Sequence, residues 1–382
     1  MIKLAFLIRS VNYGGAERHL TTLVKALDKK CFDVTVITFY SGGEFEKELR
    51  DSSIQLICVH KRGRWDISFL FRVINELRKL RPEIIHSYLV EPNVLSILLK
   101  PLFWSTKVVW SIQASDMKLD EYDWFARLNF RLQCLASRFA DLVVANSESG
   151  RDYHVSQGFP ARKCIVIHSG VDTDQFRPDR KSGERIRAEW GVPESKILIG
   201  HVARFDPMKD QPNFLKAAEL LSRERDDIRF ASVGGGTADY AATLRRLAEG
   251  YGIADRVIWA GARDDMPAVY NALDIVCSSS AFGEGLPNVI AEAMACGVPC
   301  VVTDVGDSAL LVSATGIVVP PEDPQALAKG LEECVTNIKS GQRPDTRSRI
   351  RERFDLAQLV SRTETALRML TSQPEQKCEK SA

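Results

Sequence analysis

Short apolar runs alternate with amphipathic stretches along this chain, and the alternation occurs as two successive series. In the first series, apolar runs at residues 3–8 and 84–87 lie on either side of residues 17–27, whose leucines recur at helical spacing. The second series repeats the pattern, for example with an apolar run at 196–203 and a helical stretch at 286–295. Short apolar strands that alternate with helices are typical of a parallel sheet covered on both faces. The sequence therefore predicts an α/β architecture with two Rossmann-like domains.

The boundary between the two series falls in a segment rich in turn residues, at 169–178. A length of 382 residues is enough for roughly two to three average domains. We predict an N-terminal Rossmann-like domain over residues 1–177 and a C-terminal one over 178–354. A helix over 355–372 and a polar tail over 373–382 complete the predicted organisation.

The charges of the chain nearly cancel, with 51 Lys and Arg against 50 Asp and Glu. A dedicated nucleic-acid binder carries a basic excess, so the balance argues against a nucleic-acid partner. The two halves differ, however. Residues 1–180 hold 26 basic and 21 acidic side chains, a net charge of +5, whereas residues 181–382 hold 25 and 29, a net charge of −4.

The basic half interleaves Lys and Arg with large aromatic residues in three segments, at 61–65, 98–104 and 124–131. Such a pattern suits an anionic membrane surface. An ordinary solvated face combined with core aromatics explains it equally well, and both interpretations stay open.

Nine cysteines are scattered through the chain, and none forms a CxxC pair. Their odd number and their positions within apolar runs predict reduced, buried thiols rather than a disulfide frame or a zinc site. No apolar run approaches the roughly 20 residues of a membrane-spanning helix, and the first nine residues are too short and too charged for a signal peptide. We therefore expect a cytoplasmic protein, peripheral at the inner face of the plasma membrane where the basic half binds lipid.

A glycine pair, Gly14 and Gly15, lies between the first predicted strand and the first predicted helix. Glycines there let the backbone approach a ligand, and a helix N-terminus offers N–H groups to an anion. The GxGxxG spacing of a dinucleotide site is missing, and no carboxylate directly follows the strand at 33–39, which disfavours NAD. His86, near the end of another strand, is either an acceptor contact or a structural histidine.

The segment 282–292 carries the most specific pattern. Glu284 and Glu292 are eight residues apart, with Glu284 before a strand-to-helix turn and Glu292 about two turns into the helix. The backbone N–H groups of Asn288 and Val289, at the expected helix start, can hold a diphosphate. A carboxylate beside a diphosphate is unfavourable unless it accepts hydrogen bonds from neutral hydroxyls, and the hydroxyls of a sugar and a ribose meet that requirement.

Two cations, Arg204 and Lys209, follow another predicted strand of the second series. They are expected at the carboxyl end of the sheet, where open α/β folds bind ligands. Two positive charges beside a diphosphate can stabilise its developing charge without a metal ion.

Together these motifs resemble the family 4 type glycosyltransferases, also grouped as glycosyl transferases group 1. The resemblance spans nearly the whole chain. It rests on Gly14–Glu17, Ala145–Ser147, Gly170–Asp172 with Phe176, Arg204 with Lys209, Gly234–Gly236, Gly261–Arg263 with Pro267, and the E-x7-E element Glu284/Glu292.

The resemblance implies a GT-B fold, in which two Rossmann-like domains face a central cleft and the C-terminal helix crosses back to the N-terminal domain. It implies a retaining transfer of a sugar from a nucleotide-diphosphate sugar, a UDP-sugar by expectation, to a glycan or lipid-linked acceptor. A role in bacterial surface polysaccharide synthesis, acceptor binding by the N-terminal domain and independence of a metal cofactor belong to the same expectation.

The resemblance also implies roles for individual residues. Gly14 and Gly15 approach the donor phosphates and the acceptor, while Arg204 and Lys209 bind the diphosphate. It further implies that Glu284 contacts the donor sugar, Glu292 the ribose, and Arg263 with its neighbours the base, mainly through the backbone.

This chain departs from many relatives at Gln113, which stands about where they carry a histidine near the acceptor. A glutamine can hydrogen-bond a sugar hydroxyl but cannot act as a base. The substitution favours a mechanism in which the leaving phosphate takes the acceptor proton. Asp172 and Asp174 spell a DxD pattern, but they lie in the interdomain segment, so we do not expect them to bind a metal.

Three other functions remain as alternatives. A GT-B-fold phosphorylase or epimerase would bind phosphate in the same way. A non-catalytic assembly protein would bind a sugar nucleotide without transferring the sugar. An NAD oxidoreductase is disfavoured because the GxGxxG spacing is missing and no carboxylate directly follows the strand at 33–39.

Overall fold

The computed structural model describes residues 1–63, 66–116 and 124–371. These residues form two compact units. Unit 1 contains residues up to 114, residues 124–170 and the C-terminal segment 356–371, and unit 2 contains 115–116 and 171–355. Arg64 and Trp65 of the first basic-aromatic segment, Cys378 and the predicted polar tail lie outside the described residues.

Unit 1 is built on a seven-stranded sheet in the order β3-β2-β1-β4-β5-β6-β7, and every adjacent pair is parallel. The strands are β1 (Ile2–Ile8), β2 (Phe32–Thr38), β3 (Gln55–Cys58), β4 (Ile84–Tyr88), β5 (Lys107–Ile112), β6 (Leu142–Ala145) and β7 (Cys164–Val166). The helices are α1 (Gly15–Ala26), α2 (Phe45–Asp51), α3 (Ser68–Leu80), α4 (Val90–Leu99), α5 (Trp124–Ala136), α6 (Glu148–Ser156) and α15 (Leu356–Leu370).

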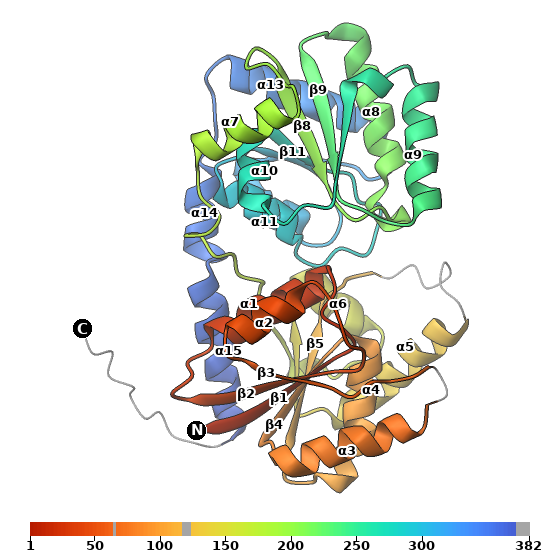
Figure 1. Cartoon of the computed structure of the whole chain (residues 1–382), viewed down its shortest axis with the longest axis vertical. Helices are drawn as coiled ribbons and strands as arrows, with labels where there is room; N and C mark the ends of the chain where they lie inside the picture. Colours follow the sequence, from red (N-terminus) through yellow and green to blue (C-terminus); the bar gives the residue numbers. More distant parts are fainter. Residues whose placement is uncertain (64–65, 117–123, 372–382) are drawn as a thin grey trace, which may run out of the picture. The chain divides into compact units, whose positions relative to one another are not determined.

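Helices cover both faces of this sheet, as parallel strands require (Figure 1). On one face, α1 and α2 pack over a core that includes Leu20 and Phe45, and on the other, α3 and α4 pack over a core that includes Phe69 and Leu95. The C-terminal helix α15 buries Leu359 and Leu367 in the same core as α1. The segment that follows unit 2 in sequence is therefore part of unit 1, as the predicted fold class requires.

Unit 2 repeats the architecture with a six-stranded parallel sheet in the order β10-β9-β8-β11-β12-β13. The strands are β8 (Ile197–Val202), β9 (Ile228–Val233), β10 (Val257–Gly261), β11 (Ile275–Ser278), β12 (Cys300–Thr303) and β13 (Ile317–Val319). The helices are α7 (Arg180–Glu189), α8 (Gln211–Glu224), α9 (Ala238–Gly250), α10 (Met266–Ala272), α11 (Asn288–Ala295), α12 (Ser308–Val312), α13 (Pro324–Lys339) and α14 (Thr346–Arg353).

Two cores enclose this second sheet. Side chains of α8, α9 and α13 form one, and side chains of α10, α11, α12 and α14 form the other (Figure 1). The predicted α/β fold of two Rossmann-like, parallel-sheet domains is confirmed.

The strand order places a topological switch point in each sheet, between β1 and β4 in unit 1 and between β8 and β11 in unit 2. At such a point neighbouring strands continue in opposite directions across the sheet, which opens a crevice outside their carboxyl ends. Segments that follow β8 and β11 therefore lie side by side at the edge of unit 2 where open α/β folds bind ligands.

Strand β7 and helix α14 are among the elements that were not predicted. Strand β7 has only three residues and forms the edge of its sheet, too little for a clear apolar run. Helix α14 carries a single large apolar residue, Ile350, among four arginines, so it has no amphipathic period, although Ile350 is fully buried.

The eight cysteines in the described part of the chain are free thiols. No helix within the described ranges combines the length and the apolar character needed to cross a bilayer.

Candidate functional site

The segments that follow β8 and β11 meet through an ion pair at the switch point of unit 2. The ammonium of Lys209 donates a hydrogen bond to Oε1 of Glu284. Both side chains are largely removed from solvent, with 18% of Lys209 and 8% of Glu284 exposed. The hydroxyl of Ser280 donates a second hydrogen bond to the same carboxylate oxygen at 2.5 Å.

This environment fixes the charge of Glu284. Burial opposes its ionisation, but the positive charge of Lys209 and the hydrogen bonds from Lys209 and Ser280 outweigh burial and hold the pKa of Glu284 below its ordinary value. The site therefore presents an ionised carboxylate whose charge is balanced by one ammonium group.

Arg204 lies at the start of the same loop as Lys209 but is held less tightly. Its guanidinium contacts the carboxylate of Asp206 at 2.9 Å, and 59% of its side chain is exposed. Asp206 also accepts a hydrogen bond from the backbone N–H of Met208, which starts the 3₁₀ turn Pro207–Lys209. The two predicted cations are thus on one short loop, with Lys209 fixed and Arg204 open to solvent.

The backbone of the Glu284 loop is held by close packing. The N–H of Ala281 donates to the carbonyl of Met208 at 2.9 Å, and the N–H of Asp307 donates to the carbonyl of Gly285 at 2.9 Å. Gly306 has a φ of +61°, and a Cβ on it would lie 2.2 Å from the carbonyl oxygen of Glu284. Only glycine fits there, so the loops after β8, β11 and β12 form one tightly packed edge.

Glu292 lies on α11, which begins at Asn288, two residues after the start of the helical stretch predicted at 286–295. The prediction that Glu292 lies about two turns into the helix is wrong: Pro287 is the N-cap, so Glu292 is the fifth helical residue, little more than one turn in. Its Oε2 accepts a 2.8 Å hydrogen bond from the hydroxyl of Tyr270, and both side chains are buried. Asn288 and Val289 are half-buried in the first turn, one turn before Glu292.

The guanidinium of Arg263 is bound by two carboxylates. It forms two hydrogen bonds of 2.8 Å with Asp265 and bonds of 2.5 and 3.2 Å with Glu189. Its charge is therefore neutralised within the protein.

The other predicted residues belong to unit 1. Gly14 is the N-cap of α1 in an extended conformation, and Gly15 is the first residue of that helix. A Cβ on Gly14 would lie 2.1 Å from Oε2 of Glu17, which is the end of a flexible side chain, so a larger residue here would require that side chain to move.

His86 lies inside the sheet of unit 1 and is 1% exposed. Its ring packs against Phe6 and Tyr88, with centroid distances of 5.1 Å to each. Burial, and in second place the neighbouring His19, lower the pKa of His86 to about 3, so the ring is neutral at pH 7. The geometry matches the structural alternative given above, although neither ring nitrogen has a partner among the described residues.

Gln113 directly follows β5, at the carboxyl end of the sheet of unit 1, and is half-buried. Its amide group donates to the hydroxyl of Ser111 at 2.7 Å.

Asp172 uses a side-chain oxygen to cap its own turn, accepting hydrogen bonds of 3.0 Å from the N–H groups of Asp174 and Gln175. The DxD pattern is therefore an Asx turn. Within the described residues, no group of three or more His, Cys, Asp or Glu side chains could hold a metal ion.

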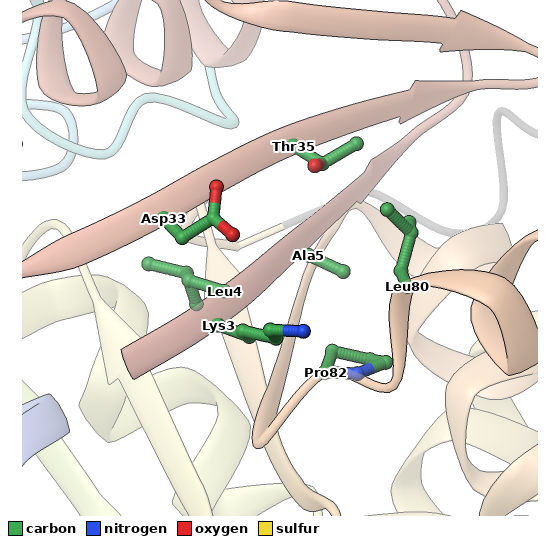
Figure 2. Close-up of a pocket in the computed structure, with 7 residues that line it drawn as sticks. All are labelled: Lys3, Leu4, Ala5, Asp33, Thr35, Leu80 and Pro82. Atoms are coloured by element: carbon green, nitrogen blue, oxygen red, sulfur yellow. The ribbon is translucent and has the colours of Figure 1, made fainter. Parts of the chain in front are cut away.

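A small cavity lies near the amino ends of β1 and β2 in unit 1, and the residues that line it include Lys3, Asp33 and Thr35 (Figure 2). Its volume of about 10 Å³ holds at most one water molecule, so it is not a ligand site.

Sequence reasoning missed the hydroxyl partners of the two glutamates, Ser280 and Tyr270. Ser280 is four residues before Glu284, and its proximity to the motif was the available signal. Tyr270 lies on a different helix, and its contact with Glu292 depends on how α10 packs beside α11.

Comparison with known proteins identifies the family. Residues 13–175 match the model of Glycosyltransferase Family 4, and residues 196–337 match that of Glycosyl transferases group 1. The putative glycosyltransferase EpsF of Bacillus subtilis is 24% identical over 304 residues, 78% of each chain. The D-inositol 3-phosphate glycosyltransferase of Mycobacteroides abscessus is 34% identical over 53% of this chain, a match that spans only 46% of that relative.

Solved structures show the same fold. The structure of Anabaena HepE in complex with UDP-glucose superposes with a TM-score of 0.85 at 24% identity, covering 97% of this chain and all of that one. The lipopolysaccharide glycosyltransferase WaaG superposes with a TM-score of 0.74 at 17% identity, covering 97% of this chain and all of that one. With its two matched family models and its GT-B fold, the chain belongs to the family 4 glycosyltransferases, the glycosyl transferases group 1.

Proposed function

We propose that this glycosyltransferase moves a sugar from a nucleotide-diphosphate sugar to a glycan or lipid-linked acceptor with retention of the anomeric configuration. The observation that carries the proposal is the Lys209–Glu284 pair at the switch point between β8 and β11, with Arg204 on the same loop. A cation pair beside an ionised carboxylate suits a ligand that joins a diphosphate to a hydroxyl-rich sugar.

In this mechanism Lys209 and Arg204 bind the diphosphate and neutralise the charge that develops on it as the bond to the sugar breaks. Glu284 accepts hydrogen bonds from sugar hydroxyls and so orients the donor. The acceptor oxygen bonds to the anomeric carbon from the face that the diphosphate leaves, and the departing phosphate oxygen takes the acceptor proton. No metal ion is required for any of these steps.

In this proposal, α11 and the segments next to it bind the nucleoside end of the donor. Glu292 accepts a hydrogen bond from Tyr270 at Oε2, and in this proposal its carboxylate also accepts hydrogen bonds from the ribose hydroxyls. The N–H groups of Asn288 and Val289 in the first turn of α11 support the diphosphate through the helix dipole. The main chain around Arg263 contacts the base.

Unit 2 therefore binds the donor, and we assign the acceptor to unit 1. Gly14 and Gly15 approach the phosphates and the acceptor, Gln113 hydrogen-bonds an acceptor hydroxyl, and His86 supports this part of the sheet from within. Because Gln113 cannot accept a proton as a base, the leaving phosphate is the group that deprotonates the acceptor.

The donor base is proposed to be uracil. HepE, which shares the fold, was solved with UDP and UDP-glucose. Relatives from Mycolicibacterium smegmatis and Mycobacterium tuberculosis, about 31–32% identical over half of this chain, are named GDP-mannose-dependent mannosyltransferases. GDP-mannose is therefore the donor against which UDP-sugars must be compared.

An exposed apolar-basic face on unit 1 supports a lipid-linked acceptor, as in surface polysaccharide synthesis, and an anionic membrane as partner. It consists of Leu98, Leu102, Trp104, Trp124, Leu128, Leu132, Leu135 and Phe139, with Arg127, Arg131 and Arg138 among them. Helices α4 and α5 pack against each other, and Lys100 Nζ donates to the carbonyl of Phe139 at 2.7 Å, so the elements that carry these residues are neighbours.

Lys61 of the first basic-aromatic segment does not contribute a free charge to this face. Lys61 is only 10% exposed and pairs with Glu91 while its ammonium lies over the rings of Phe39 and Phe69. The membrane proposal therefore rests on α4 and α5.

The proposed activity is tested by incubating the protein with UDP- and GDP-sugars and measuring nucleotide release and glycoside formation, with the anomeric configuration of the product read by NMR. Lys209→Ala, Arg204→Ala and Glu284→Gln should abolish transfer while the protein still folds, with a lower thermal unfolding midpoint for the two variants of the buried Lys209–Glu284 pair. The control variants Lys329→Ala and Glu333→Gln change exposed charges on α13, and they should transfer sugar as well as the wild-type protein does. Full activity in the site variants would overturn the assignment. Release of a free sugar phosphate would favour a phosphorylase, and binding without turnover an assembly protein.

A further inference from the structure

A buried serine joins the main chain of the Lys209 loop to a buried histidine. The hydroxyl oxygen of Ser279 lies 2.9 Å from the carbonyl oxygen of Lys209, 2.9 Å from that of Asp210, and 3.0 Å from Nε2 of His201. Ser279 is 0% and His201 1% exposed. The serine follows β11 directly, and the histidine lies within β8.

The donors and acceptors of this cluster fix its protonation. A carbonyl oxygen can only accept, so the single hydroxyl proton of Ser279 is shared between the carbonyls of Lys209 and Asp210. The contact with His201 must then be donated by the ring, which places a proton on Nε2. Burial lowers the pKa of His201 to about 4, with the neighbouring Lys209 acting in the same direction, so the ring is neutral with Nδ1 bare.

The turn that the cluster holds is strained. Asp210 has a φ of +45°, in the left-handed region, which costs a non-glycine residue of the order of 1–2 kcal/mol. The same residue is the N-cap of α8, and its side chain accepts from the N–H of Asn213. At the other end of the loop, the amide of Gln211 donates to the carbonyl of Arg204 at 2.8 Å.

We propose that Ser279 and His201 are positioning residues that hold the Lys209–Asp210 turn so that the ammonium of Lys209 stays aligned with Glu284. The inference rests on the proposed function, because it is for the bound diphosphate that the position of Lys209 matters. A rigid turn places the charge before the donor arrives, and a shift of about 1 Å in such a group costs up to about 100-fold in rate.

The first test compares variants that differ by one hydrogen-bond donor. Ser279→Ala should lower kcat by about 10- to 100-fold, since the carbonyls of the turn lose their anchor. Ser279→Thr keeps the hydroxyl and should retain most activity. His201→Gln keeps an N–H donor, so its kcat should be higher than that of His201→Met. The control is Ser137→Ala in unit 1, which removes a buried hydroxyl bonded at 2.7 Å to the carbonyl of Cys134.

The second test does not depend on turnover. Hydrogen exchange followed by mass spectrometry should show faster exchange of the amides of Lys209 and Asp210 in Ser279→Ala than in Ser137→Ala, because these two amides donate to carbonyls within the loop. Unchanged exchange and unchanged kcat in Ser279→Ala would overturn the positioning role. If the wild-type protein transfers no sugar, the proposed function is wrong. The exchange experiment still tests whether Ser279 holds the Lys209–Asp210 turn.

Discussion

Lys209 and Glu284 are 75 residues apart in sequence and form an ion pair at the edge of unit 2. Each is brought there by the end of a parallel strand, β8 or β11, and each is mostly buried. Removing one partner would leave the other charge without compensation in a site of low dielectric, which is more costly than losing the attraction alone.

We predict that Lys209 and Glu284 are coupled energetically. In a double-mutant cycle of Lys209→Met, Glu284→Gln and the combination, the coupling in unfolding free energy should be about 1–3 kcal/mol. Urea unfolding followed by circular dichroism measures it. The exposed pair Arg180–Glu184 on α7 is the control and should show no measurable coupling. Additive effects at Lys209 and Glu284 would contradict the prediction.

The E-x7-E spacing and the two cations could be identified from sequence because each motif is contained in one loop and its neighbouring helix. The expected parallel strands also predicted that these residues lie at the carboxyl end of the second sheet. The depth of Glu292 was misjudged, since the helix starts only after Pro287. The hydroxyls of Ser279 and Tyr270 could not be assigned to partners, because those contacts join segments whose distance depends on side-chain packing.

Tyr270 offers a test of the ribose assignment. Tyr270→Phe removes the 2.8 Å hydrogen bond to Glu292 and leaves a buried carboxylate oxygen without that donor. The loss of one such bond to a charged group costs about 1–3 kcal/mol, and we expect the Kd of UDP to rise about 3- to 10-fold. Calorimetry with 2′,3′-dideoxy-UDP provides the control, because a nucleotide without ribose hydroxyls should bind both proteins alike. An equal loss for both nucleotides would place Glu292 away from the ribose.

Buried histidines should make the fold sensitive to mild acid. Burial lowers the pKa of His19, His154 and His201 to about 4, from 6.5. Between these values the unfolded chain binds protons that the folded chain does not, so stability is complete above pH 6.5 and falls as the pH drops toward 4. Each such histidine adds a slope of up to about 1.4 kcal/mol per pH unit.

Urea unfolding between pH 7.5 and 5 measures this slope. His154→Gln should reduce it, because the ring that resists protonation is gone. His60→Gln, at an exposed position, should leave it unchanged. A slope that does not differ between His154→Gln and the wild-type protein would exclude this histidine as a source of the acid sensitivity.

The apolar-basic face of unit 1 predicts binding to anionic lipid. On α5 the exposed residues Trp124, Leu128 and Leu132 recur every four residues, and Arg127 and Arg131 lie between them. Apolar side chains that enter the lipid interface and arginines that meet anionic headgroups act together, whereas either alone binds weakly. We therefore expect the protein to sediment with vesicles that contain phosphatidylglycerol and to stay in the supernatant with phosphatidylcholine alone or in high salt.

The double variant Leu128→Gln/Leu132→Gln should lower this partitioning at least fivefold, since glutamine preserves the helix but removes the apolar contact. Leu310→Gln in unit 2 is the matched control, because Leu310 is similarly exposed, at 40%, but lies on α12. Transfer to a water-soluble acceptor should be the same in both variants, which separates membrane docking from chemistry. Equal sedimentation of both variants with anionic vesicles would show that the α5 face does not contact the bilayer.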